Sequence, residues 1–91
     1  MKENEEIIST ISYIKRSKNR LKLITIIGDT FKMPSELAEE MNLRINQISA
    51  ILSDLKKENI VVCINENAKT GRFYQLTDKG KEAYELIKQN K

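Results

Sequence analysis

The sequence predicts a small α+β domain that is mostly α, with five helices, one short edge strand and one β-hairpin. Three observations predict this class. Apolar residues recur at helical spacing in several segments. The pattern changes to a continuous β-branched run at "IVVCI". Turn-forming residues separate the segments. The 91 residues suit a single domain over 1–91, and 40% hydrophobic with 32% charged residues is typical of a folded chain.

The first two helices follow from apolar periodicity and from the residues at their ends. A first helix over about residues 4–15 carries four isoleucines on one predicted face, namely Ile7, Ile8, Ile11 and Ile14. Ser17 is a suitable N-cap for a second helix, whose apolar residues are Leu21, Leu23, Ile24 and Ile27. Gly28 then tolerates the positive φ that often ends a helix.

Two further helices are joined by a very tight turn, after "DTFKM" has supplied one short edge strand. Pro34 begins a helix over 34–41, because the first helical turn needs no N–H donor there. The next helix covers about 45–58. Their expected core residues are Leu37, Ala38, Met41, Ile48, Ile51, Leu52 and Leu55. The small Ala38 permits a close helix crossing, and Asn42 accepts the left-handed backbone that the turn requires. This is helix-turn-helix spacing, and the second helix of that motif can enter a DNA major groove.

A hairpin and a last helix complete the chain, and here the sequence resembles a known family. "IVVCI" and "FYQLT" are the expected strands, and Thr77 caps a helix that turns Ala83, Leu86 and Ile87 inward. "SELAEEMNLRINQISAILSDLKKENIV" and "YQLTDKGKEAYELI" resemble the corresponding segments of archaeal and bacterial MarR-like and ArsR-like regulators. The resemblance covers about residues 18–87. It implies a winged helix-turn-helix with a small antiparallel β-wing and flanking N- and C-terminal helices.

The resemblance also implies a function: sequence-specific binding of double-stranded DNA as a transcriptional regulator, usually as a homodimer. The helix over 45–58 would enter the major groove, and the wing over 65–72 would lie near the minor groove or the phosphates. By position, the DNA-binding residues are Arg44, Asn46, Gln47, Ser49, Ala50, Ser53, Lys69, Thr70 and Arg72. Their chemistry agrees, since Asn and Gln amides can bond adenine edges and an alanine can touch a thymine methyl. A wing cation can follow the minor groove.

The positive charges gather before the helix-turn-helix rather than within it. The net charge is +3, yet acids outnumber bases over residues 34–58. "KRSKNRLK" contains no acid and holds Lys15, Arg16, Lys18, Arg20 and Lys22. Lys18 is therefore a candidate phosphate contact, with a solvated helix junction as the alternative.

One residue departs from the family pattern at the start of the recognition helix. Arg44 stands where a Ser or Thr cap is usual, and its side chain cannot accept an N–H bond. We therefore expect this helix to start a residue or two later, with Asn46 as a possible cap.

Composition argues against an enzyme and against a metal sensor. The chain has no His and a single cysteine, Cys63, so neither a nucleophile–base pair nor a thiolate cluster can be assembled. We expect no catalytic residue, no cofactor and no metal, and we interpret Cys63 as a structural thiol, with a redox switch as the alternative. The apolar runs are short and the first residues are acidic, which predicts a cytoplasmic protein without a membrane partner.

Several alternatives stay open at this point. The domain could be a protein-interaction module of the transcription machinery, which the acidic motif helices would suit, or a nucleoid-type protein that coats DNA without sequence preference. The isoleucines within residues 1–16 could belong to the core or to a dimerisation element. Whether a small-molecule effector binds is unknown.

Overall fold

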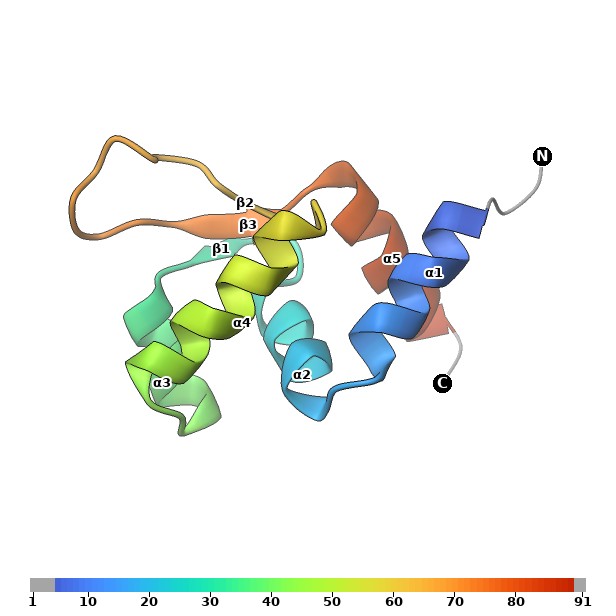
Figure 1. Cartoon of the computed structure of the whole chain (residues 1–91), viewed down its shortest axis with the longest axis horizontal. Helices are drawn as coiled ribbons and strands as arrows, with labels where there is room; N and C mark the ends of the chain where they lie inside the picture. Colours follow the sequence, from blue (N-terminus) through green and yellow to red (C-terminus); the bar gives the residue numbers. More distant parts are fainter. Residues whose placement is uncertain (1–4, 90–91) are drawn as a thin grey trace.

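The computed structural model describes residues 5–89, in which five helices pack beside a three-stranded antiparallel sheet (Figure 1). The helices are α1 (Glu5–Lys15), α2 (Lys18–Ile27), α3 (Pro34–Met41), α4 (Ile45–Lys57) and α5 (Asp78–Gln89). The strands are β1 (Phe31–Lys32), β2 (Val61–Cys63) and β3 (Tyr74–Leu76). The predicted α+β class and order of elements are confirmed. The expected first helical residue, Asn4, and both ends of the expected domain over 1–91 lie outside the described residues.

Local capping explains most of the helix boundaries. The Ser17 hydroxyl accepts a backbone N–H from the first turn of α2 at 3.3 Å, and Gly28 ends that helix at a φ of 49°. Asn42 has the left-handed conformation, with φ 57° and ψ 45°, between α3 and α4. Thr77 Oγ1 accepts the N–H of Gly80 at 3.0 Å in the first turn of α5. These four predictions from single residues are confirmed.

The start of α4 differs from the prediction. Arg44 is extended, with φ −74° and ψ 152°, and α4 begins directly after it at Ile45. The side chain of Gln47 turns back, and its Oε1 accepts the N–H of Arg44 at 3.1 Å. Gln47 thus makes the half of a capping box that runs from the third helical residue back to the cap N–H, while the other half, a bond from a Ser or Thr cap to the first turn, is missing. The expected shift of the helix start and capping by Asn46 are both wrong.

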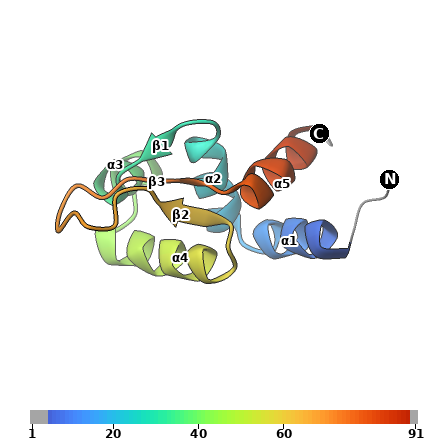
Figure 2. The same cartoon turned by 90° about the horizontal axis from the view of Figure 1, so that it is seen from above.

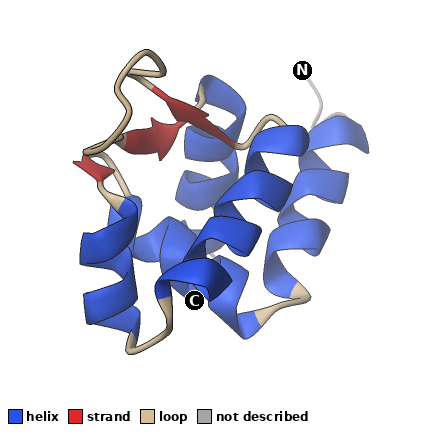
Figure 3. Cartoon of the chain, turned by 60° about the vertical axis from the view of Figure 1, so that its left-hand side comes forward, coloured by secondary structure: helices blue, strands red, loops and turns tan. Residues whose placement is uncertain are grey.

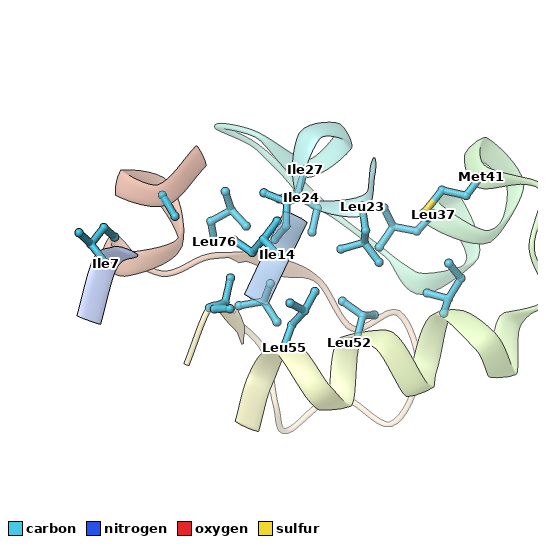
Figure 4. Packing of buried hydrophobic residues seen from close by; sticks show 14 residues of the cluster. Ile7, Ile14, Leu23, Ile24, Ile27, Leu37, Met41, Leu52, Leu55 and Leu76 are labelled. Carbon is cyan, nitrogen blue, oxygen red and sulfur yellow. The ribbon is translucent and has the colours of Figure 1, made fainter. Parts of the chain in front are cut away.

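The core lies between the helices and the inner face of the sheet. Leu52 and Leu55 of α4 point toward Ile14 of α1 and Ile24 of α2 in the close view (Figure 4). Of the isoleucines expected in the core or in a dimerisation element, Ile7 and Ile14 are buried in the core, whereas Ile8 is 53% exposed. Thr10 is buried in α1 instead, and its hydroxyl donates to the Glu6 carbonyl at 2.8 Å.

The two ends of the molecule are formed by different elements. Helices α1 and α5 pack against each other at one end, and the loop between β2 and β3 projects from the other (Figure 1). The strand order is β1-β3-β2, so β1 is an edge strand as predicted. Seen from above, β2 lies on the side of the sheet nearest α4 (Figure 2). The sheet therefore holds the β2–β3 loop beside α4.

The alternation along β2 places the single cysteine inside. Val61 and Cys63 are buried, and Val62 between them is exposed. Cys63 is only 5% exposed, which supports its interpretation as a structural thiol. Within residues 5–89, no helix combines the length and the apolar character needed to cross a membrane.

Candidate nucleic-acid interface

Helix α4 presents one continuous polar face to solvent. The helix is held by its opposite face, where Ile48, Leu52 and Leu55 are buried in the core. All the residues predicted to contact DNA from this element are exposed, namely Arg44, Asn46, Gln47, Ser49, Ala50 and Ser53. The packing of α4 on the core therefore determines which of its side chains are exposed to solvent.

The two amides of this face are not equivalent. Gln47 Oε1 already accepts the N–H of Arg44, and this bond turns the Gln47 amide back toward the start of the helix. Among residues 5–89, Asn46 has no side-chain hydrogen bond, and both its donor and its acceptor face solvent. An adenine edge needs one donor and one acceptor together. Asn46 is thus better prepared than Gln47 for a bidentate base contact.

The loop of residues 64–73 is the wing, and a single side chain organises it. Asn65 Oδ1 accepts the N–H of Phe73 at 2.8 Å, and Asn65 Nδ2 donates to the Gly71 carbonyl at 3.1 Å. Arg72 donates its Nε to the Ala68 carbonyl at 2.8 Å. The three predicted wing contacts are all exposed, namely Lys69, Thr70 and Arg72. Asn65 therefore presents these exposed side chains on a loop of defined shape.

We expect Asn65→Ala to loosen the wing. The substitution removes an acceptor and a donor that close the loop, and each such bond contributes about 1 kcal/mol. The free energy of unfolding should fall by about 1–2 kcal/mol in urea denaturation, and the Phe73 amide should exchange faster. The control is Asn67→Ala in the same loop, because the Asn67 side chain is exposed and makes no hydrogen bond within residues 5–89. Equal stability of the two variants would contradict the role of Asn65.

A groove runs between α4 and the wing. One hollow of about 500 Å³ is bounded by the first turn of α3, by Ile45 and Ser49 of α4, and by the wing from Lys69 to Arg72. A smaller hollow continues along α4 to Ser53 and Lys56, and the two share Pro34, Ser49 and Tyr74. The groove thus has hydroxyl groups along its length and cations at both ends.

One ion pair connects the end of α4 to the wing. Lys56 Nζ lies 2.7 Å from Glu66 Oε2, and both side chains are about half exposed. The hydrogen bond with Glu66 raises the pKa of Lys56, and the same bond lowers the pKa of Glu66 below its ordinary value of 4.5. A carboxyl with a lowered pKa keeps its contribution to folding stability at neutral pH, and it loses that contribution only as the pH falls through the lowered pKa. Both side chains of the pair are therefore charged at neutral pH.

The basic segment before the helix-turn-helix is only partly available. Arg20 donates Nη1 to the Tyr13 carbonyl at 2.7 Å, and its guanidinium lies 3.8 Å from the centre of the Tyr13 ring. Arg20 therefore joins α1 to α2. Lys18 is exposed in the first turn of α2. The start of α2 and the α3–α4 turn lie at the end of the molecule opposite the strands (Figure 3). The structure does not bring Lys18 together with the wing residues.

Sequence reasoning missed Ile45, Asn65 and Tyr74. An Asn directly after an apolar strand and before a loop with Gly is a signal for side-chain bonds to a turn, so Asn65 could have been found. Tyr74 and Ile45 carry no such signal, because their role depends on where the wing lies relative to α4. Within residues 5–89 there is no group of three or more His, Cys, Asp or Glu side chains that could hold a metal ion.

Solved structures with this fold include DNA-binding proteins. HlyU from Vibrio cholerae N16961 superposes with a TM-score of 0.80 at 20% identity, covering 99% of this chain and 97% of HlyU. TubR bound to 24 bp of tubC from Bacillus thuringiensis serovar israelensis pBtoxis gives a TM-score of 0.81 at 16% identity, covering 100% and 99%. The homodimeric winged helix-turn-helix DNA-binding domain of Mb0332 from Mycobacterium bovis, a possible ArsR-family transcriptional regulator, gives 0.77 at 14% identity, covering 93% and 78%.

The chain therefore has the winged helix-turn-helix fold, as the resemblance in its sequence implied. No family model matches the sequence, and no curated protein matches it.

Proposed function

We propose that this protein binds double-stranded DNA sequence-specifically and acts as a transcriptional regulator. One observation carries the proposal: the serines of the exposed α4 face, Ser49 and Ser53, line the same groove as the wing cations Lys69 and Arg72. In this proposal α4 lies in the major groove, and the wing lies near the minor groove or its phosphates. The DNA-bound neighbour TubR supports the proposal, because it shares the fold over the whole chain.

The groove is suited to the DNA strand that separates the major groove from the minor groove. If α4 and the wing occupy adjacent DNA grooves, the phosphodiester backbone between them must pass along this hollow. Ser49 and Thr70 can donate hydroxyl bonds to its phosphates, and Lys69 and Arg72 lie beside it with the opposite charge. Phosphate contacts then fix the register, and α4 selects the bases.

The predicted site residues take separate roles in this proposal. Asn46 reads adenine, Ala50 contacts a thymine methyl, and Ser53 bonds a base or a phosphate. Gln47 acts mainly by accepting the backbone N–H of Arg44 at the start of α4. The Arg44 guanidinium takes no part in that bond and contacts the DNA backbone. Lys18 contacts phosphates at the end of the interface remote from the wing.

A homodimer is part of the proposal, as is a non-enzymatic role in the cytoplasm for a single domain over 1–91. The solved domain of Mb0332 is homodimeric, which supports a similar arrangement here. The dimer interface would involve α1. Not all isoleucines of α1 could take part, because Ile7 and Ile14 are buried within one chain. Ile8 is exposed and free to meet a second copy.

The test is selection of duplexes from a random pool, followed by fluorescence anisotropy against salt and unrelated competitor DNA. We expect tight, competitor-resistant binding that weakens at least tenfold in the double variant Asn46→Ala/Ser49→Ala, since a good base contact provides about 1–3 kcal/mol of discrimination. The control is Asn19→Ala/Ser9→Ala, which removes the same two side-chain types from exposed positions of α2 and α1.

The other outcomes identify the alternatives. Steeply salt-dependent binding without sequence preference would indicate a DNA-coating protein. No binding at low salt would contradict the proposal and favour a protein-interaction module. Equal loss in both double variants would mean that the face of α4 does not select the bases.

A further inference from the structure

Ile45 is an apolar side chain in an otherwise polar interface. It is the first residue of α4 and is 50% exposed. The other large hydrophobic residues exposed within residues 5–89 lie outside α3 and α4, and they are Ile8, Phe31, Val62 and Ile64. A single exposed isoleucine is by itself unremarkable on a protein surface. Its location is what distinguishes Ile45.

The neighbours of Ile45 define what could cover it. Ile45 lines the larger part of the groove together with Ser49, Lys69 and Arg72. These neighbours are suited to an anion with hydrogen-bond acceptors, whereas the isoleucine side chain can offer only apolar contact. A ligand complementary to this wall must therefore be strongly anionic and must also carry an apolar group close to its charges.

Duplex DNA has one such group in the major groove. The C5 methyl of thymine is the apolar feature that a base edge presents there, and apolar side chains from alanine to phenylalanine contact it. Residues at the amino end of a recognition helix are those that reach base edges. Ile45 occupies that end, and the bond between Gln47 and Arg44 holds the first turn of the helix in place.

From this geometry we infer that Ile45 reads a thymine methyl and so determines specificity for T at one position of the DNA site. The inference rests on the proposed function and deepens it, because it assigns a base to a residue. Burying one methyl group against an isoleucine is worth a fewfold change in affinity, given about 0.8 kcal/mol per buried carbon. The thymine read by Ile45 is separate from any thymine that contacts Ala50, which lies on a different side of the helix.

The test replaces each thymine of the selected duplex, one at a time, with deoxyuridine, which lacks only the methyl group. For the unmodified protein, we expect one position at which uracil weakens binding about three- to fivefold. In Ile45→Ala that position should become indifferent to uracil. Val62→Ala is the control, because Val62 is also an exposed β-branched residue but lies in β2, outside α4, the wing and the groove lining, and it should keep the uracil penalty.

Each result has a distinct meaning. The inference would be overturned if Ile45→Ala kept every uracil penalty that the unmodified protein shows. It would also be overturned if uracil weakened binding of the unmodified protein at no position. In both cases specific DNA binding, and with it the proposed function, would stand. Failure to select any duplex would instead remove the proposed function itself. Ile45→Ala should melt at the same temperature as the unmodified protein, since alanine is well tolerated in an exposed helix.

Discussion

Gly80→Ala should strongly destabilise the protein, although the same substitution normally stabilises a helix. A Cβ at residue 80 would lie within 2.3 Å of the Ile60 carbonyl oxygen. That carbonyl cannot move away easily, because it accepts the Thr77 N–H at 2.9 Å and the Thr77 hydroxyl at 3.2 Å. Overpacking typically costs about 1–3 kcal/mol and occasionally more, and so short a contact with a backbone oxygen belongs at the upper end of that range, so its cost exceeds the roughly 1 kcal/mol that alanine gains over glycine in a helix.

We therefore expect the free energy of unfolding to fall by about 2 kcal/mol, and the melting temperature by about 8–16 °C for a domain of this size. Glu82→Ala is the control, because Glu82 is exposed on the same helix. Calorimetry of both variants makes the comparison. A melting temperature that rises in Gly80→Ala would show that the start of α5 is not held against Ile60.

The double variant Lys69→Ala/Arg72→Ala should lose most of its affinity for DNA. Both side chains are exposed on the wing and line the groove, so their removal takes two cations from the expected path of the backbone. Each neutralised phosphate contributes about 0.9 to the slope of log affinity against log salt. The slope should become shallower by roughly 2, and affinity at low salt should fall about a hundredfold.

The control for this variant is Lys81→Ala/Lys88→Ala, which removes the same charge from α5. Helix α5 packs against α1 at the end of the molecule away from the wing (Figure 1). An unchanged salt slope in the control separates a local wing contact from the effect of net charge. If the two double variants lose affinity equally, the wing does not contact phosphates.

Much of the fold could be predicted because single residues determine its boundaries. Ser17, Gly28, Asn42 and Thr77 each have a local conformational or capping role that does not depend on the rest of the chain. For the opposite reason, the sequence alone could not decide whether Ile8 belongs to the core or to a dimerisation element. Periodicity places it near the apolar face, but where that face ends depends on how α5 packs against α1.

The candidate site was predictable in outline and not in its internal organisation. Exposure of the α4 face follows from its periodicity, and exposure of the wing follows from its polar composition. The bond from Gln47 to the Arg44 N–H could not be foreseen by treating each side chain as a base reader. The groove that brings Ile45 near Arg72 joins residues far apart in sequence, and only the packing of the sheet against α4 places them together.

The cap formed by Gln47 has a consequence for any attempt to alter the proposed DNA preference of this protein. A residue that holds the start of the recognition helix cannot be exchanged freely, because a new side chain there changes the helix as well as the contact. Asn46, Ser49, Ala50 and Ser53 make no such bond within the described part of the chain. A library that randomises those four positions and keeps Gln47 would explore new target sequences on an unaltered scaffold, whereas one that includes position 47 would mix recognition with folding.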